Sequence, residues 1–437
     1  MICTSTRGNA APASFRDALF RGQAPDGGLY MPQDLPTLTT ADLDSLARQS
    51  YPELAYELGR RMLGDEIDDA GTAAIAQSAY SFAPQLHELR NDLHVLELFH
   101  GPTCSFKDFG AQFMAKAMGY FARDGSRPLT ILVATSGDTG SAVAHAYHHV
   151  EGIRIVLLYP SGKVSPLQEK QFTTLGDNVQ AIEVQGTFDD CQAMVKQAFA
   201  DEELSVRVRL SSANSINIGR LIPQSFYYVW SVAQRRRDRS NSVMVCVPSG
   251  NFGNLTAGFF AKRMGVPIEM FVAAVNANAV IPEYLETGTY RPRPSIRTYS
   301  NAMDVGAPSN WERIRSLYED DYERIKAVLW STSVDDECTV IRMQQTFERY
   351  HYIADPHTAV GLEAVERIRR QVPRTAESAF ISLSTAHPAK FNEVVELALG
   401  KPADLPQPLQ EVMTKEKNAL PMGNRYTHLK EYLWHTN

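Results

Sequence analysis

The chain has 437 residues, more than one domain usually holds, so we expect two or three domains. Hydrophobic residues make up 44% of the chain and charged residues 21%, which favours packed cores and excludes intrinsic disorder. Because 43 Lys and Arg face 50 Asp and Glu, a net charge of -7 leaves no basic field to attract nucleic acid or a membrane surface, and we expect neither as a partner.

The five cysteines are an odd number, are widely separated and include no CxxC pair of a zinc site or a redox motif. They indicate reduced thiols. The first residues lack the basic start and apolar stretch of a signal peptide. We therefore predict a cytoplasmic protein without a metal site.

Residues 1–95 are predicted to be mostly helical, since apolar residues such as Leu54, Leu58 and Met62 recur at helical spacing. Beyond this region, short apolar runs alternate with segments of helical period, which is typical of an α/β fold with a parallel sheet covered by helices. The predicted strands are 129–134, 153–159, 179–184, 243–247, 270–275 and 380–383. The predicted helices are 141–148, 189–200, a long helix ending at 234, 255–264 and 389–397.

Three loops join a predicted strand to a predicted helix and are rich in glycine or hydroxyl groups. Ligands of open α/β sheets bind at these carboxyl ends, where backbone N–H groups and helix dipoles favour anions. In the loop 249–254 (SGNFGN), two glycines three residues apart let the main chain approach a phosphate closely. An ordinary βα turn is the alternative. No Walker or GxGxxG motif occurs, so ATP and NAD lose support.

The loop 135–140 (TSGDTG) offers three hydroxyls at a helix start, which suits a substrate carboxylate, although a helix cap has the same composition. The segment 214–217 leads into a helix that carries Arg220 about a turn and a half beyond Ser215. Amide, hydroxyl and guanidinium groups could converge there on a second phosphate. A helix cap followed by a surface arginine is the alternative.

Lys107 lies between two phenylalanines and opens a predicted helix after a Gly-Pro turn. Partial desolvation and the positive end of the helix dipole both make its amine easier to deprotonate, and a neutral amine can form a Schiff base. Most lysines are solvated surface residues, so this prediction depends on the separate phosphate loop. Together they indicate pyridoxal 5'-phosphate, whose pyridine nitrogen could face a hydroxyl of Ser384 or Thr385.

These motifs resemble those of the threonine synthases, of the longer bacterial and fungal type among the fold-type-II pyridoxal phosphate enzymes. The resemblance runs along nearly the whole chain, through the segments 24–32 (APDGGLYMP), 99–109 (FHGPTCSFKDF), 135–140 (TSGDTG), 159–165 (YPSGKVS), 212–220 (SANSINIGR), 248–254 (PSGNFGN), 300–305 (SNAMDV) and 385–391 (TAHPAKF). It implies two open, mostly parallel sheets covered by helices. We divide the chain into a helical region 1–95, a smaller α/β domain 96–225 and a large cofactor-binding domain 226–437, whose segments can interleave.

The resemblance also implies roles for individual residues, with Lys107 as the Schiff-base lysine. The cofactor is expected to contact Lys107, Asp138, Gly250, Asn251, Phe252, Gly253, Asn254 and Thr385. The substrate carboxylate is expected near Thr135, Ser136 and Thr139, and the substrate phosphate near Asn214, Ser215 and Arg220, with Lys163 as a weaker candidate. Asp138 is implied to contact the phenolic oxygen of the cofactor. Many fold-type-II relatives have Asn at this position.

The implied reaction, the last step of threonine biosynthesis, converts O-phospho-L-homoserine and water to L-threonine and phosphate. A serine or threonine dehydratase, or an O-phosphohomoserine phospholyase, would share Lys107 and the loop 250–254. A dehydratase would not need the second phosphate site. A noncatalytic binder of phosphorylated metabolites would not need Lys107. The sequence leaves both a monomer and a homodimer open.

Overall fold

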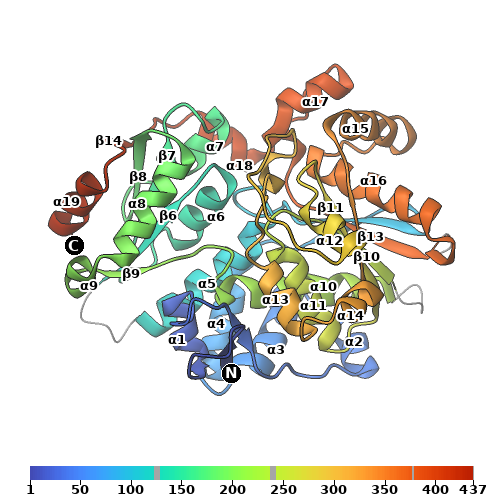
Figure 1. The fold of residues 1–437 in the computed structure, drawn as a ribbon, viewed down its shortest axis with the longest axis horizontal. Helices are drawn as coiled ribbons and strands as arrows, with labels where there is room; N and C mark the ends of the chain where they lie inside the picture. The colour runs from blue at the N-terminus through green and yellow to red at the C-terminus, as the bar shows by residue number, and fades with distance from the viewer. Residues whose placement is uncertain (123–127, 237–242, 376–377, 437) are drawn as a thin grey trace.

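Two open sheets frame the molecule in a computed structural model that describes residues 1–122, 128–236, 243–375 and 378–436 (Figure 1). The six-stranded sheet has the order β12 (Leu329–Ser333), β11 (Ile268–Val275), β10 (Val243–Pro248), β13 (Ala379–Ser384), β5 (Leu93–Glu97), β4 (Gln85–Arg90). The five-stranded sheet has the order β14 (Leu420–Gly423), β8 (Val179–Gln185), β7 (Ile153–Pro160), β6 (Leu129–Ala134), β9 (Arg209–Ser211). Only the β4–β5 pair is antiparallel in these two sheets, so the predicted α/β class with mostly parallel sheets is confirmed.

Strand membership does not follow chain order. The early strands β4 and β5 lie beside β13, and the late strand β14 lies beside β8. The sequence-based boundary at 95/96 falls inside β5, and the boundary at 225/226 falls inside α10 (Ile218–Arg236). Pairing between strands that are distant in the chain decides which sheet each strand joins. A local sequence pattern does not predict this pairing.

All six predicted strands are present. Five of them, such as β6 and β10, are nearly continuous buried apolar runs, as expected of strands covered on both faces. The shorter strands β9 and β14 and the half-exposed β12 were not predicted, because they lack such a run. Strands β4 and β5 were missed as well, because residues 1–95 were assigned to a mostly helical region.

The N-terminal region is helical, as predicted, but it also contains a small antiparallel sheet. Its helices are α1 (Phe15–Arg21), α2 (Thr40–Leu46), α3 (Tyr51–Leu63) and α4 (Asp69–Ala79). Ser50 and Glu53 form a capping box at the start of α3, whose Leu54, Leu58 and Met62 are buried. The unpredicted sheet has the order β2 (Ala13–Ser14), β1 (Ile2–Ser5), β3 (Tyr30–Pro32).

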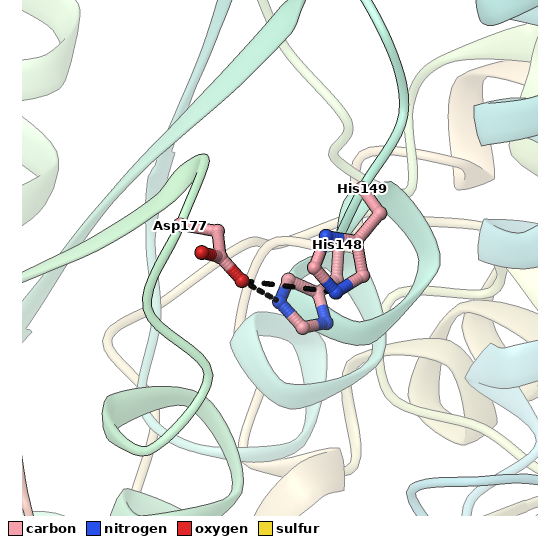
Figure 2. Close-up of side chains that lie close together, drawn as sticks. All are labelled: His148, His149 and Asp177. Carbon is pink, nitrogen blue, oxygen red and sulfur yellow. Dashed lines mark hydrogen bonds and ion pairs between the residues drawn. The ribbon is translucent and has the colours of Figure 1, made fainter.

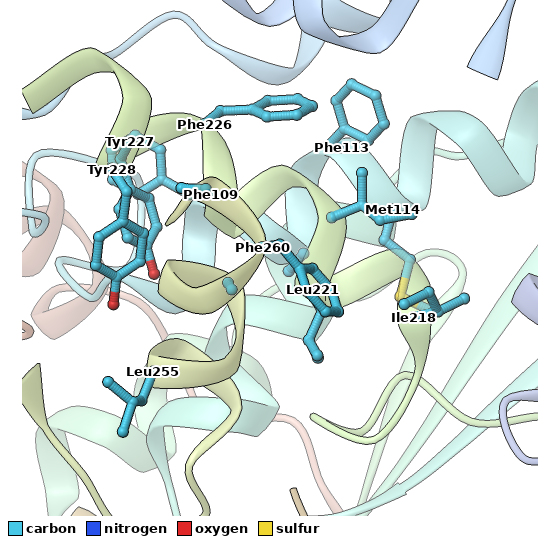
Figure 3. Packing of buried hydrophobic residues seen from close by; sticks show 14 of the residues in the cluster. Phe109, Phe113, Met114, Ile218, Leu221, Phe226, Tyr227, Tyr228, Leu255 and Phe260 are labelled. Carbon is cyan, nitrogen blue, oxygen red and sulfur yellow. The ribbon is translucent and has the colours of Figure 1, made fainter. Parts of the chain in front are cut away.

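A helical layer joins the two sheets. The helix α10 packs against both α5 (Lys107–Ala122) and α11 (Gly253–Arg263). Figure 3 shows the apolar side chains at these contacts, among them Phe109, Phe113, Met114, Ile218, Leu221, Phe226, Tyr227, Tyr228, Leu255 and Phe260. Because α5, α10 and α11 each begin within or directly after one of the predicted functional segments, their packing fixes the relative positions of those segments.

The remaining helices cover the sheets or follow their edges (Figure 1). They are α6 (Asp138–Tyr147), α7 (Pro166–Thr173), α8 (Phe188–Ala200), α9 (Glu202–Arg207), α12 (Val280–Thr287), α13 (Trp311–Leu317), α14 (Tyr322–Val328), α15 (Asp336–Tyr350), α16 (Pro356–Gln371), α17 (Asn392–Leu399), α18 (Gln407–Met413) and α19 (Tyr426–Thr436). The helix predicted at 141–148 starts earlier, at Asp138, which places that carboxylate in its first turn. None of the described helices is both long and apolar enough to cross a membrane.

Candidate active site

Lys107 is the first residue of α5 and is held against the carboxyl end of β13. The backbone N–H of Phe106 donates to the carbonyl of Thr385 at 2.9 Å, and Ser105 forms a β-bridge with Ala386. The backbone N–H of Lys107 donates to the Ser105 hydroxyl at 3.2 Å. These bonds join two of the predicted functional segments, which are far apart in the chain.

The amine of Lys107 is largely buried, with 14% of its side chain exposed. Burial is the main cause that lowers its pKa, and the nearby cations Lys390 and Arg220 lower it further. The carboxylate of Asp138 acts in the opposite direction, with its Oδ2 3.4 Å from Lys107 Nζ. The net lowering favours the neutral, nucleophilic amine, as the sequence predicted.

Asp138 lies between two lysines. Its Oδ1 is 2.7 Å from the Nζ of Lys390 and accepts a hydrogen bond of 2.8 Å from Gln168. Burial alone would raise the pKa of Asp138, but Lys390 and Lys107 hold it well below its usual range. Lys390 is fully buried and also donates to the carbonyl of Thr103 at 2.8 Å. The chain therefore buries a Lys107–Asp138–Lys390 triad.

Lys390 was not among the predicted site residues. It lies in a short 3-10 helix, η3 (Pro388–Phe391), just after β13 and far from Asp138 in the chain. Its position in the quoted segment 385–391 was visible, but only tertiary structure shows that its charge is buried.

The loop 249–254 connects β10 to the first turn of α11. Phe252 has a left-handed φ of 61°, which turns the chain at the helix start. Gly250 packs so closely on the segment 300–305 that a Cβ atom would lie 2.7 Å from the Cα of Met303. Glycine is therefore required at this position, and the helix N-terminus leaves backbone N–H groups available for an anion.

Asn254 turns its amide toward α10. Its Oδ1 accepts hydrogen bonds from the hydroxyls of Tyr227 and Tyr228, both at 2.6 Å. Its Nδ2 is buried and has no hydrogen-bond partner within the part of the chain that the structure describes. An unsatisfied buried donor of this kind is costly unless a ligand satisfies it.

The second phosphate segment lies directly beside this loop. The Nδ2 of Asn251 donates to the Ser215 hydroxyl at 2.7 Å, and the Nδ2 of Asn310 donates to the Ser215 carbonyl at 3.4 Å. Arg313, which the sequence analysis missed, is fully buried and donates to the carbonyls of Ile216 at 2.5 Å and Tyr30 at 3.0 Å. The sequence contained little indication of a role for Arg313, because the residue lies in a segment with an ordinary helical pattern.

Arg220 is buried, with 2% exposed, so the alternative of a surface arginine is excluded. One guanidinium N–H group donates to the carbonyl of Ala213 at 2.9 Å, whereas Nε has no partner among the described residues. Burial lowers the pKa of Arg220 to about 10, which still leaves it a cation at neutral pH. Asn214 and Ser215 are half-buried beside it.

The loop 135–140 is shaped by Thr135. The buried Thr135 hydroxyl accepts the backbone N–H groups of Gly137 at 3.0 Å and Gly140 at 2.8 Å. Ser136 is exposed and Thr139 is half-buried, so these two hydroxyls remain accessible at the start of α6. Lys163 is exposed in the turn after β7.

The two candidate hydroxyls at the end of β13 differ. The Ser384 hydroxyl lies 2.7 Å from that of Thr358, which in turn donates to the buried Asp355. The Thr385 hydroxyl has no hydrogen bond among the residues described, so it is the one available for a ligand.

These residues fit pyridoxal phosphate. Asn254 Nδ2 and Arg220 Nε are buried donors without a partner among the described residues, and they lie in the first turns of α11 and α10, where anions are favoured. The buried amine of Lys107 suits an aldehyde, and the Thr385 hydroxyl suits a neutral ring nitrogen.

The chain is similar to known proteins over nearly its whole length. The chain matches the family "Pyridoxal-phosphate dependent enzyme" over residues 72–382, "Threonine synthase N terminus" over 3–80 and "Threonine synthase, C-terminal" over 358–433. It is 44% identical to the threonine synthase of Escherichia coli (strain K12), over 91% of each chain, and 42% identical to that of Haemophilus influenzae, over 96% of each chain.

A solved structure gives the same result. The X-ray structure of PLP-bound threonine synthase from Brucella melitensis matches with a TM-score of 0.93 and 34% identity, covering 100% of this chain and 99% of that chain. The predicted family resemblance is confirmed by both sequence and fold. The chain belongs to the threonine synthase family of pyridoxal-phosphate-dependent enzymes.

Proposed function

We propose that the chain converts O-phospho-L-homoserine and water to L-threonine and phosphate, with Lys107 as its catalytic lysine. One observation carries the proposal: the amine of Lys107 is buried beside Asp138 and within reach of the charge of Arg220, while the two proposed phosphate segments meet where Asn251 donates to Ser215. Two phosphate groups, one of the cofactor and one of the substrate, account for both segments.

Bound pyridoxal phosphate supplies an aldehyde for the amino group of the substrate and a ring that stores negative charge. Lys107, whose lowered pKa favours the neutral amine, takes up the proton from the substrate Cα and then serves the proton transfer at Cβ. The Asp138 carboxylate keeps the Lys107 amine in place. Because Asp138 is also paired with Lys390, it holds the proton of Lys107 less strongly than a free carboxylate would.

The proposed cofactor contacts are the backbone of Gly250, Asn251, Phe252, Gly253 and Asn254 for the phosphate, Thr385 for the pyridine nitrogen, and Asp138 for the phenolic side of the ring. The proposed contacts of the substrate phosphate are Asn214, Ser215 and Arg220, with Lys163 as a weaker candidate. Ser136 and Thr139 are proposed to bind the substrate carboxylate, and the Thr135 hydroxyl holds their loop in shape.

Assembly and location are also proposals. We propose that the two sheets mark two domains. The early strands β4 and β5 belong to the six-stranded sheet, and the late strand β14 belongs to the five-stranded sheet, so each domain is built from separate segments of the chain. All five cysteines are free thiols, which supports a cytoplasmic location. Size-exclusion chromatography with light scattering would distinguish a monomer from a homodimer.

The test is to incubate the purified protein and pyridoxal phosphate with O-phospho-L-homoserine and to quantify phosphate and threonine. Equal amounts of the two products are expected, and Lys107→Ala abolishes both. Lys116→Ala, on the same helix α5, is the matched control and retains activity. Phosphate together with 2-oxobutanoate would indicate a lyase instead, and no turnover would contradict the proposed substrate.

A further inference from the structure

Two turns of the five-stranded sheet bring together two histidines and an aspartate. His148 and His149 follow the last turn of α6, and Asp177 lies in the turn before β8 (Figure 2). His148 is half-buried, and the other two side chains are exposed. The cluster lies at the amino-terminal ends of β7 and β8. The loops of the candidate active site follow the carboxyl ends of the strands, so the two sites are at opposite ends of the strands.

The separations within the cluster match those of metal ligands. The Oδ2 of Asp177 is 3.3 Å from His148 Nε2 and 3.7 Å from His149 Nε2. All three ligand atoms lie within 4.8 Å of one another. Donors bound at about 2.0–2.1 Å in a tetrahedral site stand roughly 3.3 Å apart. The two imidazole rings lie against each other with centroids 3.7 Å apart, so they must rotate until both nitrogens face one ion.

Asn178 holds the two turns in register. Its Oδ1 accepts the backbone N–H of His149 at 2.9 Å, and its Nδ2 donates to the carbonyls of Tyr147 at 2.8 Å and Ile153 at 2.9 Å. His149 and Asp177 themselves have left-handed φ values of 61° and 51°. The backbone that carries the three ligands is therefore fixed before any ion binds.

Charges around the cluster act in both directions. The C-terminal end of α6 and the carboxylate of Asp177 attract a cation. Lys415 and the half-buried His145 also act on His148, and Lys415 opposes a bound cation. Because two of the three ligands are imidazole nitrogens, an ion that binds nitrogen is favoured over Mg²⁺ or Ca²⁺, which prefer oxygen ligands.

We propose that His148, His149 and Asp177 bind one divalent transition-metal ion of the zinc class, with water in the remaining position. The sequence predicted no metal site, because it contains no CxxC pair. Asp177 is 28 residues from His149, and only the fold brings the two together. The ion would link the α6–β7 turn to the α7–β8 turn and stabilise the five-stranded sheet, with no part in catalysis.

The test is a calorimetric titration of untagged, cofactor-loaded protein with Zn²⁺ in a buffer that does not chelate metal. One ion per chain is expected, together with a higher melting temperature. His149→Asn and Asp177→Asn each weaken binding by about tenfold or more and remove the thermal shift. Asparagine is chosen because it tolerates the left-handed backbone at both positions.

Two matched controls separate this site from others. His435→Asn removes an exposed histidine outside the cluster and leaves binding unchanged, and Cys338→Ser tests the one cysteine that is not buried. Absence of saturable one-to-one binding would overturn the proposal. So would binding that survives both cluster variants or is lost in Cys338→Ser. Threonine synthesis is unaffected by His149→Asn, so the result is independent of the proposed catalytic roles.

Discussion

Helix α6 begins and ends in clusters of the same chemical kind, a carboxylate between two nitrogen bases. At its start Asp138 is 7% exposed and lies between Lys107 and Lys390, whereas beyond its end Asp177 is 63% exposed and lies beside His148 and His149. Burial strengthens the interactions of the first cluster and moves the pKa values of Lys107 and Asp138. Water screens the second cluster, so it contributes little unless an ion binds. The comparison indicates that the surroundings, more than the residue types, set the energy of such a cluster.

Lys107→Ala should have the largest effect, because it removes the amine on which both the cofactor bond and the proton transfers depend. We expect kcat to fall by about 10³-fold or more. The visible absorption band of the lysine-bound cofactor should disappear as well, in a spectrum recorded after saturation with pyridoxal phosphate. A variant that keeps both the band and the activity would exclude Lys107 from the catalytic role.

Lys390→Met should destabilise the protein by about 3–5 kcal/mol, since it leaves the buried Asp138 without its closer cation. Urea unfolding of the cofactor-loaded protein measures this change. The double variant Lys390→Met with Asp138→Asn should recover part of the loss, because no unpaired buried charge remains.

Lys430→Met is the matched control, because the ion pairs of Lys430 with Asp201 and Glu203 are more exposed than the pair of Lys390 with Asp138. It should cost much less than Lys390→Met, because water screens its charge. Equal costs for Lys390→Met and Lys430→Met would contradict the importance of burial.

His145, in the last turn of α6, should make the stability of the protein depend on pH. Burial lowers the pKa of His145 from 6.5 to about 4, so between these values the unfolded chain binds more protons than the folded one. The stability that a neutral His145 provides is present above pH 6.5 and is lost as pH falls toward 4. His145→Gln should reduce the slope of unfolding free energy against pH by about 1 kcal/mol per pH unit in that window. An unchanged slope would show that His145 does not titrate as its burial implies.

Arg220→Lys tests the proposed phosphate site, because it keeps the charge but removes the planar fork of donors. We expect KM for O-phospho-L-homoserine to rise about tenfold, with a smaller change in kcat. Steady-state kinetics measures both parameters. A fall in kcat at constant KM would indicate that Arg220 supports the fold of the site and does not bind the phosphate.

Asp177→Asn should have the smallest effect on stability. Without added metal we expect a loss of no more than about 1 kcal/mol, because its ion pairs are exposed. Urea unfolding in the presence of a chelator measures this value. A loss as large as that of Lys390→Met would mean that exposure does not decide the contribution of these clusters.

Much of the fold was predictable because its strands are apolar runs with local boundaries. The strand at 129–134 has the predicted bounds. The loops after β6 and β10 lie where glycines or residues with a hydroxyl group interrupt the apolar pattern. The missed strands β9 and β14 are short, and distant partners create them. The helix start at Asp138 was missed by three residues, because Gly137 and Gly140 obscure the helical pattern.

The sequence by itself determined which residue types stand at the strand ends and that Lys107 opens a helix, since propensity, glycine placement and apolar periodicity are local properties. Only the tertiary structure decided that Lys390 pairs with Asp138, that Arg220 and Arg313 are buried, and that Asp177 meets two histidines. These contacts join segments far apart in the chain. Their energies depend on burial, which is a property of the packed molecule.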